Sequence, residues 1–510
     1  MIRAYIAALL AGASAIGLLP VSDAPPAEFF RVWKQPVPPG PRITPYLRHQ
    51  AEQAWKEDEA RQEAWDSIRD EASLLKTQDE LRQKLLQMIG GLPAVKTDLQ
   101  PVITGKIAMD GYSIERLIFQ SLPGLYVTAL VYVPNDHAGK HPAVLVPAGH
   151  ASDGKSHYQA LSQRLVGRGY VVISWDPIGQ GERSQFWDQK AQKSRYNLIC
   201  GEHAVLGNLA YLAGANLARW EIWDGIRAVD YLLTRPEVDG ERISITGTSG
   251  GGTQTALIAA LDPRIKLAVP SCYITALPMR MSNRIFADPD SDPEQDLFGM
   301  ISSGVDHPGL LLLMYPRPVM VAAAVLDFFP IEGTRKTYRE LQRLYARFGH
   351  GDRIALVEGY HSHQYSPENQ QAALDFLDHF NRMPVRSSLP PVKELGDESL
   401  RCTRTGQVLL DYRDARSLVE LIREYYIEHK TGTARRLATE YYGEKYGGVK
   451  DWRVGEYRGA PPKDGEIAWE SAGSAKVGEV AIDRYVLHHS AELEMPLLHI
   501  HKPGARDRKV

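Results

Sequence analysis

The sequence predicts a doubly wound α/β fold with a mostly parallel sheet, an N-terminal helical arm and a smaller C-terminal α+β appendage. Short apolar runs, typical of strands buried on both faces, recur through the middle of the chain, and segments with helical spacing of apolar residues separate them. Repeated strand, helix, strand connections require a parallel sheet. The expected strands span 142–148, 170–175, 243–247, 265–270, 318–326 and 353–358, and the expected helices span 158–167, 217–234, 251–261, 334–347 and 367–381.

The composition excludes several classes of protein. Hydrophobic residues make up 44% and charged residues 24% of the 510 residues, which are globular proportions. The formal net charge of −3 provides no general basic field, so nucleic acid is not an expected partner. Three cysteines, at 200, 272 and 402, form no CxxC pair, so neither a disulfide scaffold nor a zinc ribbon is expected.

The amino terminus, residues 1–24, is interpreted as a signal peptide. Arg3 is followed by an apolar core of small residues and leucines (AYIAALLAGASAIGLL), which is typical of export signals. We therefore expect a periplasmic or secreted protein with no membrane span after the signal is removed. Residues 25–98 are expected to be a helical region, in which Thr77 and Glu80 form a capping box that opens a helix ending at Ile89.

Residues 99–385 are expected to form the main domain. The domain begins with an antiparallel hairpin, because the extended runs YSIERLIFQS and LYVTALVYVP flank a Leu-Pro-Gly turn. A long insertion, 275–316, is too long for an ordinary connection and is interpreted as a lid.

Beyond a Pro-rich linker, residues 386–475 are expected to be helical or mixed and residues 476–510 to form a β-hairpin. A strand pair is expected at 403–412, and helices at 416–430 and 434–445. Residues 482–503 echo residues 114–134, since both segments begin Ile, acid, Arg and both end in a strand closed by proline. This echo indicates either the start of a second domain of the same kind or a coincidental hairpin, and the sequence leaves both open.

The strand 243–246 leads into Gly247, Thr248, Ser249, Gly250 and Gly251 and then into a helix. A G-x-S-x-G motif at a strand-to-helix turn is typical of a nucleophilic serine, because the sharp turn exposes the hydroxyl group. The helix N-terminus behind the serine favours a developing oxyanion. The sequence therefore predicts Ser249 as the nucleophile.

In this type of fold the acid and the histidine follow the nucleophile in chain order, in loops after later strands. Asp327, at the end of a predicted strand, is the expected acid, with Glu332 as the alternative. The loop after the last strand holds two histidines, His361 and His363, and either could be the base.

The oxyanion is expected to be held by backbone amides on two loops. One donor is the amide of Gly250, and the other is that of His150, or of the adjacent Ala151.

No cofactor and no metal centre are expected. His488, His489, His499 and His501 lie on the predicted hairpin and are interpreted as a polar strand face. The run TGTSGGGT does not fit a dinucleotide fingerprint, which would need glycine where Ser249 or Thr255 stands.

These residues resemble the α/β-hydrolase superfamily, and more narrowly the acetylxylan esterase type related to carbohydrate esterase family 7 and to prolyl-oligopeptidase-like hydrolases. The resemblance covers roughly residues 90–384 and rests on GYVVISWDPIGQGERS, RPEVDGERISITGTSGGGTQT and VLDFFP. The resemblance implies that Asp327 is the acid and that His363 is the base. In that family the catalytic histidine precedes an aromatic residue by two positions and a helix by about four, and the sequence HQYSP, which begins at His363, fits this spacing. Gly250, in place of glutamine, and Ala148-Gly149-His150, in place of His-Gly-Tyr, depart from the family pattern.

The resemblance implies a serine carboxylic-ester hydrolase that works through a Ser-Asp-His triad and an acyl-enzyme. The implied substrate is an ester of a small molecule, an oligosaccharide or a polysaccharide, in particular acetylated plant cell-wall carbohydrate. A serine peptidase of the prolyl-oligopeptidase type and a catalytically inactive hydrolase-fold binding module are the alternatives. The oligomeric state stays open.

Overall fold

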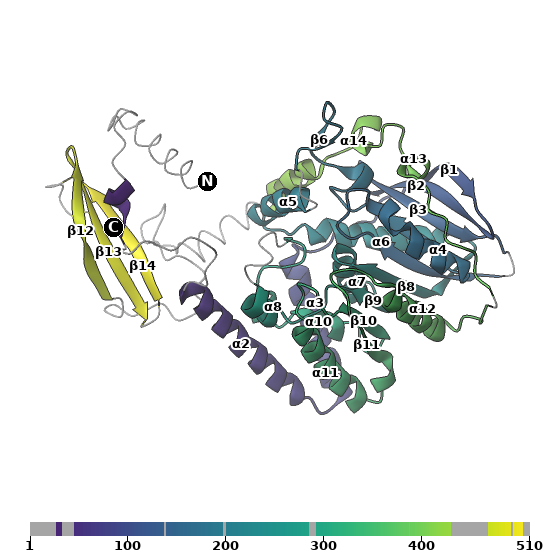
Figure 1. The fold of residues 1–510 in the computed structure, drawn as a ribbon, viewed down its shortest axis with the longest axis horizontal. Coiled ribbons are helices and arrows are strands. Elements are labelled where there is room, and N and C mark those ends of the chain that lie inside the picture. Colours follow the sequence, from purple (N-terminus) through teal and green to yellow (C-terminus); the bar gives the residue numbers. More distant parts are fainter. Residues whose placement is uncertain are drawn as a thin grey trace. The chain divides into compact units, whose positions relative to one another are not determined.

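The chain forms two compact units in a computed structural model (Figure 1). The larger unit spans Gln53–Thr433, and the smaller one combines Met1–Glu52 with Ala434–Val510. The structure describes residues 27–32, 45–136, 139–196, 200–284, 292–386, 388–429, 468–490 and 493–502. The expected signal peptide and the expected helix 434–445 lie outside these residues.

The larger unit is built on a nine-stranded sheet with the order β1-β2-β3-β5-β4-β8-β9-β10-β11. The predicted hairpin is present as the antiparallel pair β2 and β3, and from β5 to β11 all neighbouring strands are parallel. The mostly parallel α/β architecture predicted from the sequence is therefore confirmed. The strands are β1 (Val102–Ala108), β2 (Tyr112–Leu122), β3 (Leu125–Pro134), β4 (His141–Pro147), β5 (Val171–Trp175), β8 (Val238–Thr248), β9 (Ile265–Ser271), β10 (Val319–Ala324) and β11 (Ile354–Gly359).

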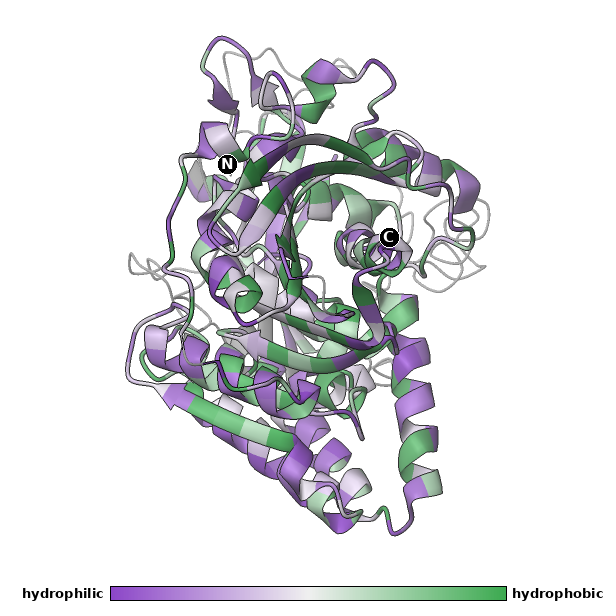
Figure 2. Ribbon diagram, turned by 90° about the vertical axis from the view of Figure 1, so that its right-hand side faces the viewer, coloured by the Kyte–Doolittle hydropathy of each residue, from purple (hydrophilic) through white to green (hydrophobic). Residues whose placement is uncertain are grey.

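Helices cover both faces of this sheet, which explains the nearly continuous apolar runs of its central strands. In β5, Val171 and Ile173 belong to one hydrophobic cluster, whereas Val172 belongs to another on the opposite face. Several of these helices are amphipathic, and Figure 2 shows helical ribbons that alternate between green and purple. The first cluster is closed by α3 (Glu71–Met88), α6 (Ala218–Thr234), α7 (Gly250–Leu261), α10 (His307–Leu312) and α11 (Ile331–Arg347), and the second by α4 (Gln159–Gly167) and α12 (Pro367–Asn381).

The N-terminal arm consists of α2 (Pro45–Asp66) and α3. The predicted start of the second helix at Thr77 is wrong, because Asp70 caps α3 by accepting a 2.8 Å hydrogen bond from Ser73 N. Thr77 instead donates to Ser73 O inside the helix. The side-chain amide of the buried Gln78 donates to Leu312 O at 2.6 Å, so α3 is fastened to α10.

The insertion predicted as a lid contains α8 (Leu277–Arg284), α9 (Met300–Ser303) and α10. Its described part is largely buried, and His307 is fully enclosed and accepts from Thr275 N at 2.8 Å. Residues 285–291 within it lie outside the described residues. Across the part of the chain that the structure describes, none of the helices has the length and apolar character needed to cross a bilayer.

The segment 388–429 contains α13 (Asp397–Leu400), α14 (Val408–Asp411) and a helix at 418–429. The strand pair predicted at 403–412 is wrong. Carboxylates bind the backbone amides that a neighbouring strand would otherwise bind: Glu182 accepts from Thr403 N at 2.7 Å, and Asp411 accepts from Thr405 N at 3.1 Å.

The smaller unit contains the 3₁₀ turn η1 (Ala27–Phe30) and an antiparallel sheet of β12 (Ala468–Val477), β13 (Val480–Ser490) and β14 (Leu493–His501). A hairpin was expected from residue 476 onwards, but the sheet already begins with β12, whose exposed and polar sequence lacks apolar alternation. The echoing segments adopt similar pairings, because β2 lies between β1 and β3 as β13 lies between β12 and β14.

Candidate active site

Ser249 lies at the turn between β8 and α7 and has the dihedral angles φ 59° and ψ −125°. A non-glycine residue with positive φ is strained and is held there only by its surroundings. Here the Ser249 N–H donates to Ser271 O at 3.0 Å, while its carbonyl accepts from Thr253 N at 2.9 Å and so begins the helix. The turn therefore presents the serine side chain at the carboxyl end of the sheet.

The glycines of the motif are required by the close approach of neighbouring backbone. A Cβ atom on Gly251 would collide with Pro147 O at the end of β4, and one on Gly247 would lie 2.7 Å from Gly251 O. These contacts explain why glycine flanks Ser249 in the sequence.

Asp327 and His363 are joined by a hydrogen bond, with 2.8 Å between Oδ1 of Asp327 and Nδ1 of His363. The two residues follow β10 and β11, whose parallel pairing aligns Ala324 with Gly359 and so brings the two loops together. The Asp327 side chain is 1% exposed and the His363 ring 25% exposed. The Phe328 ring stacks on His363, with centroids 4.3 Å apart, and fixes the plane of the imidazole.

The end of β9 contacts both the serine turn and the loop that holds His363. Ser249 is bonded to Ser271, and the next residue, Cys272, donates from Sγ to Gln364 O at 3.2 Å, beside His363. Within the described residues, the Ser249 hydroxyl takes part in no hydrogen bond. Contacts of this kind are often long without substrate and tighten in the complex.

The alternatives for the acid and the base lie elsewhere. His361 bonds through Nε2 to Glu368 at 2.9 Å, on the first turn of α12, and does not bond to Asp327. Glu332 is exposed on the first turn of α11. The geometry therefore favours Asp327 and His363 over both alternatives.

The loop with the second predicted oxyanion donor lies directly against the serine turn. A Cβ atom on Gly149 would collide with Thr248 O, so only glycine permits this approach. The Gln180 side-chain amide donates to Gly149 O at 2.7 Å and to Ala151 O at 3.2 Å, and thereby holds the carbonyl groups of both residues adjacent to His150. This role explains the glutamine of the Gly-Gln-Gly sequence, whose function sequence reasoning did not identify.

Beneath this loop lies a buried ionic network that the sequence analysis also missed. Lys155 Nζ lies 2.6 Å from Asp176 Oδ2 and 2.7 Å from Glu182 Oε1. Burial by itself would lower the pKa of Lys155, but the attraction of the two carboxylates outweighs it and raises the pKa above its usual range. The DPIGQGE sequence was the available signal, since it places both acids beside Gln180.

A cluster of four ionisable side chains lies next to the serine turn. It comprises His150, His203, Asp292 and Glu294, whose potential ligand atoms all lie within 4.8 Å of one another. The sequence did not indicate this cluster, because folding brings its residues together from three separate segments. Asp483 joins His499 and His501 in a second, partly exposed group on β13 and β14.

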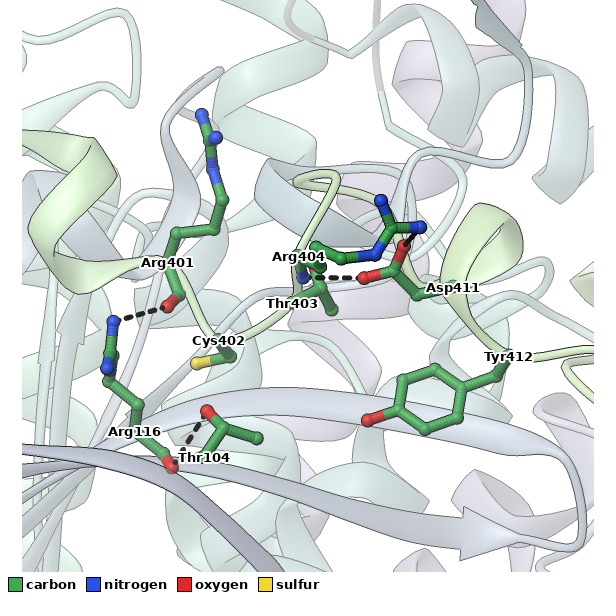
Figure 3. A pocket seen from close by; sticks show the side chains of 8 residues that line it. All are labelled: Thr104, Arg116, Arg401, Cys402, Thr403, Arg404, Asp411 and Tyr412. Carbon is green, nitrogen blue, oxygen red and sulfur yellow. Dashed lines mark hydrogen bonds and ion pairs between the residues drawn. The ribbon is translucent and has the colours of Figure 1, made fainter.

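A cavity of about 480 Å³ lies where the segment 401–412 packs on β1 and β2 (Figure 3). Arg116 donates to Arg401 O at 3.3 Å there, and Arg404 pairs with Asp411 at 3.4 Å. None of the predicted site residues lines this cavity.

A serine at a strained strand-to-helix turn, with an aspartate and a histidine after later parallel strands, defines the class of α/β-hydrolases. Residues 91–276 match the acetyl xylan esterase family, AXE1, so this part of the chain is similar to the α/β-hydrolases of that family. The matched region contains Ser249, Gly250 and His150. Asp327 and His363 lie beyond it, so their assignment depends on geometry and motif.

Two known proteins are similar to this chain over most of their own length. The protein YtaP of Bacillus subtilis (strain 168), whose name describes it as a hydrolase, is 26% identical to this chain over 317 residues. The alignment covers 58% of this chain and 98% of YtaP. The solved structure of the methylesterase BT1017 is 22% identical, with a TM-score of 0.56, and the alignment covers 72% of this chain and 78% of that one. The second likeness concerns the fold alone.

Proposed function

We propose that this chain is a serine carboxylic-ester hydrolase with Ser249 as nucleophile, His363 as general base and acid, and Asp327 as the partner of His363. The observation that carries the proposal is the 2.8 Å hydrogen bond between His363 and Asp327 at the sheet edge that also holds the strained Ser249 turn. The family match supports hydrolysis as the class of reaction.

In the proposed reaction, Ser249 Oγ attacks the ester carbonyl while His363 Nε2 takes the hydroxyl proton. Asp327 stabilises the resulting imidazolium through the Nδ1 hydrogen bond. His363 then protonates the leaving alkoxide, which departs as the alcohol and leaves an acyl-serine ester. Water attacks this ester, His363 accepts a proton from the water, and the carboxylic acid is released as Ser249 regains its proton. These steps need no cofactor.

The oxyanion of both tetrahedral intermediates would accept hydrogen bonds from the amides of Gly250 and His150. Gly250 is the first residue of α7, so its N–H points out of the helix at the positive end of the dipole. Gln180 holds the carbonyls of Gly149 and Ala151, which limits the rotation of the peptides around His150. The site is therefore organised before substrate arrives, as electrostatic catalysis requires.

The proposed substrate is an acetyl ester of plant cell-wall carbohydrate, and the description of the matching family supports it. Residues 1–24 have the composition of an export signal, so we further propose that the protein acts in the periplasm or outside the cell. Mass spectrometry of the mature N-terminus from fractionated cells tests the location.

The function is tested by comparing p-nitrophenyl acetate hydrolysis by the wild type and Ser249→Ala, followed by acetate release from acetylated xylan. Turnover should fall about a millionfold in the variant. The exposed Ser399→Ala is the matched control and should retain wild-type rates. Equal activity of wild type and Ser249→Ala would refute the mechanism.

Two further assays separate the alternatives. Faster cleavage of a peptide anilide than of any ester would favour the peptidase alternative. A wild type that is inert both to esters and to a serine-reactive organophosphate would favour the binding-module alternative.

A further inference from the structure

Four buried side chains converge beside the serine turn. His150 follows β4, His203 lies on α5 (Gly201–Leu212), and Asp292 and Glu294 lie between α8 and α9. Each of these side chains is at most 8% exposed. The proposed reaction uses only the backbone amide of His150, so the chemistry of the four side chains is unassigned.

Three of the polar atoms form a nearly equilateral triangle. His150 Nε2 lies 3.1 Å from His203 Nδ1 and 3.0 Å from Glu294 Oε1, and His203 Nδ1 lies 3.0 Å from Glu294 Oε1. Neutral imidazoles cannot satisfy all three contacts. His203 Nε2 lies 2.7 Å from Ile178 O, and a carbonyl oxygen only accepts, so Nε2 carries the proton and Nδ1 of the neutral ring presents a lone pair to the carboxylate.

A cation at the apex above this triangle removes the conflict. An ion about 2.0 to 2.1 Å from each atom, the usual range for zinc with nitrogen or carboxylate oxygen, would stand about 1 Å out of their plane. The ligand–ion–ligand angles would be about 95°, which lies between the angles of octahedral and of tetrahedral coordination. Imidazole and carboxylate together favour a divalent transition metal over calcium or magnesium.

The surroundings supply the outer contacts that such a site needs. A histidine ligand normally donates its other N–H to a carbonyl or a carboxylate, which orients the ring. His203 does so to Ile178 O, and His150 Nδ1 faces Asp292 Oδ2 at 3.5 Å. Among the described residues, Glu294 Oε2 has no hydrogen-bond partner although its side chain is 99% buried, which is costly without a compensating cation.

We propose that His150 Nε2, His203 Nδ1 and the Glu294 carboxylate bind one divalent transition-metal ion, with Zn²⁺ the first to be tested, while Asp292 orients His150. The ion joins the loop after β4, α5 and the segment before α9. Because the site is almost fully enclosed, the ion acts as a structural tether and does not contact substrate.

The tether has a consequence for the active site. A Cβ atom on Gly250 would lie 2.8 to 3.1 Å from the ring atoms of His150, so this ring packs directly on the residue after the nucleophile. An ion on Nε2 fixes the ring and, with it, the backbone amide of His150. This consequence rests on the proposed function, whereas metal binding itself does not.

The binding test uses the full, untagged chain, first dialysed against a chelator and then titrated with Zn²⁺. We expect one tightly bound ion that depends on His203 and Glu294, a rise in melting temperature on its binding, and visible absorption bands when Co²⁺ replaces Zn²⁺. Glu294→Gln and His203→Gln should each weaken binding at least about a hundredfold, and Asp292→Asn about ten- to a hundredfold. Glu294→Gln keeps the side-chain size, so it remains informative if His203→Gln does not fold.

The matched control is His157→Gln, because His157 is 57% exposed and pairs with Asp153 outside the cluster. It should bind Zn²⁺ as the wild type does, and so should Ser249→Ala, which separates the fate of this site from that of the proposed esterase activity. His501→Gln disables the group with Asp483 on the small sheet and should leave the tight ion in place. If the wild type binds none of Zn²⁺, Co²⁺, Ni²⁺ or Mn²⁺ stoichiometrically, or if Glu294→Gln binds as tightly as the wild type, a proton instead of a metal holds the cluster and the proposal falls.

Discussion

His363 Nδ1 lies 2.8 Å from Asp327 Oδ1, and this hydrogen bond connects the loops that follow the last two strands of the parallel sheet. Oδ1 also accepts from Phe329 N at 3.1 Å, so the carboxylate is held before it orients the imidazole. The bond places the Nδ1 proton toward Asp327 and leaves Nε2 with the lone pair that the proposed reaction requires.

Asp327→Asn should reduce kcat for p-nitrophenyl acetate about ten-thousandfold. The amide can still accept from Phe329 N, but it cannot stabilise the imidazolium and it permits the wrong tautomer of His363. The melting temperature should change little by comparison. A loss smaller than about tenfold in a folded variant would contradict the role of Asp327.

The two histidines of the last loop should respond differently to substitution. His363→Ala should abolish turnover to the level of Ser249→Ala, because the variant loses the proposed general base. His361→Ala should retain activity within about threefold, because the ring is bonded to Glu368 on the surface and the pair contributes at most about 1 kcal/mol. The reverse ranking of the two variants would move the base to His361.

Gln180→Leu should lower kcat by about ten- to a hundredfold, with a smaller change in KM. Two carbonyl groups beside His150 lose their donor, so the backbone amide of His150, the proposed oxyanion donor, is no longer held in place. Gln189→Leu is the matched control, because it makes the same substitution at an exposed glutamine, and it should behave as the wild type does. A rise in KM alone would show that Gln180 serves substrate binding instead.

Asp306 should make the folded state less stable as pH rises. It accepts from Leu277 N at 3.2 Å, and burial raises the pKa of its carboxyl group to about 7 despite the backbone hydrogen bonds, which lower it. Between about pH 4 and pH 7 the folded chain therefore binds a proton that the unfolded chain lacks, so this group's contribution to the free energy of unfolding falls as pH rises through that window.

Asp306→Asn removes this titration. Urea unfolding of the variant and the wild type at pH 4.5 and pH 8 should show the variant gaining stability relative to the wild type at the higher pH, by up to a few kcal/mol. A stability difference that does not change with pH would show that Asp306 is ionised throughout this range.

The alternation of apolar runs was sufficient to predict the sheet and most of its helices. The failures occurred where partners distant in sequence replace a local signal. The segment 403–412 was predicted as a strand pair, yet Glu182 and Asp411 bind its amides. The exposed strand β12 was not predicted, because apolar and polar residues do not alternate along its sequence.

The sequence by itself predicted Ser249 as the nucleophile and the chain order of the proposed triad, because the Gly-x-Ser-x-Gly turn is local and the parallel sheet requires the remaining groups to follow later strands. Reasoning from the residues alone left both His361 and His363 as candidates for the base. Only the tertiary structure decided which histidine meets Asp327 and brought His150, His203 and Glu294 together, because those distances depend on how separate segments pack and no spacing along the chain encodes them.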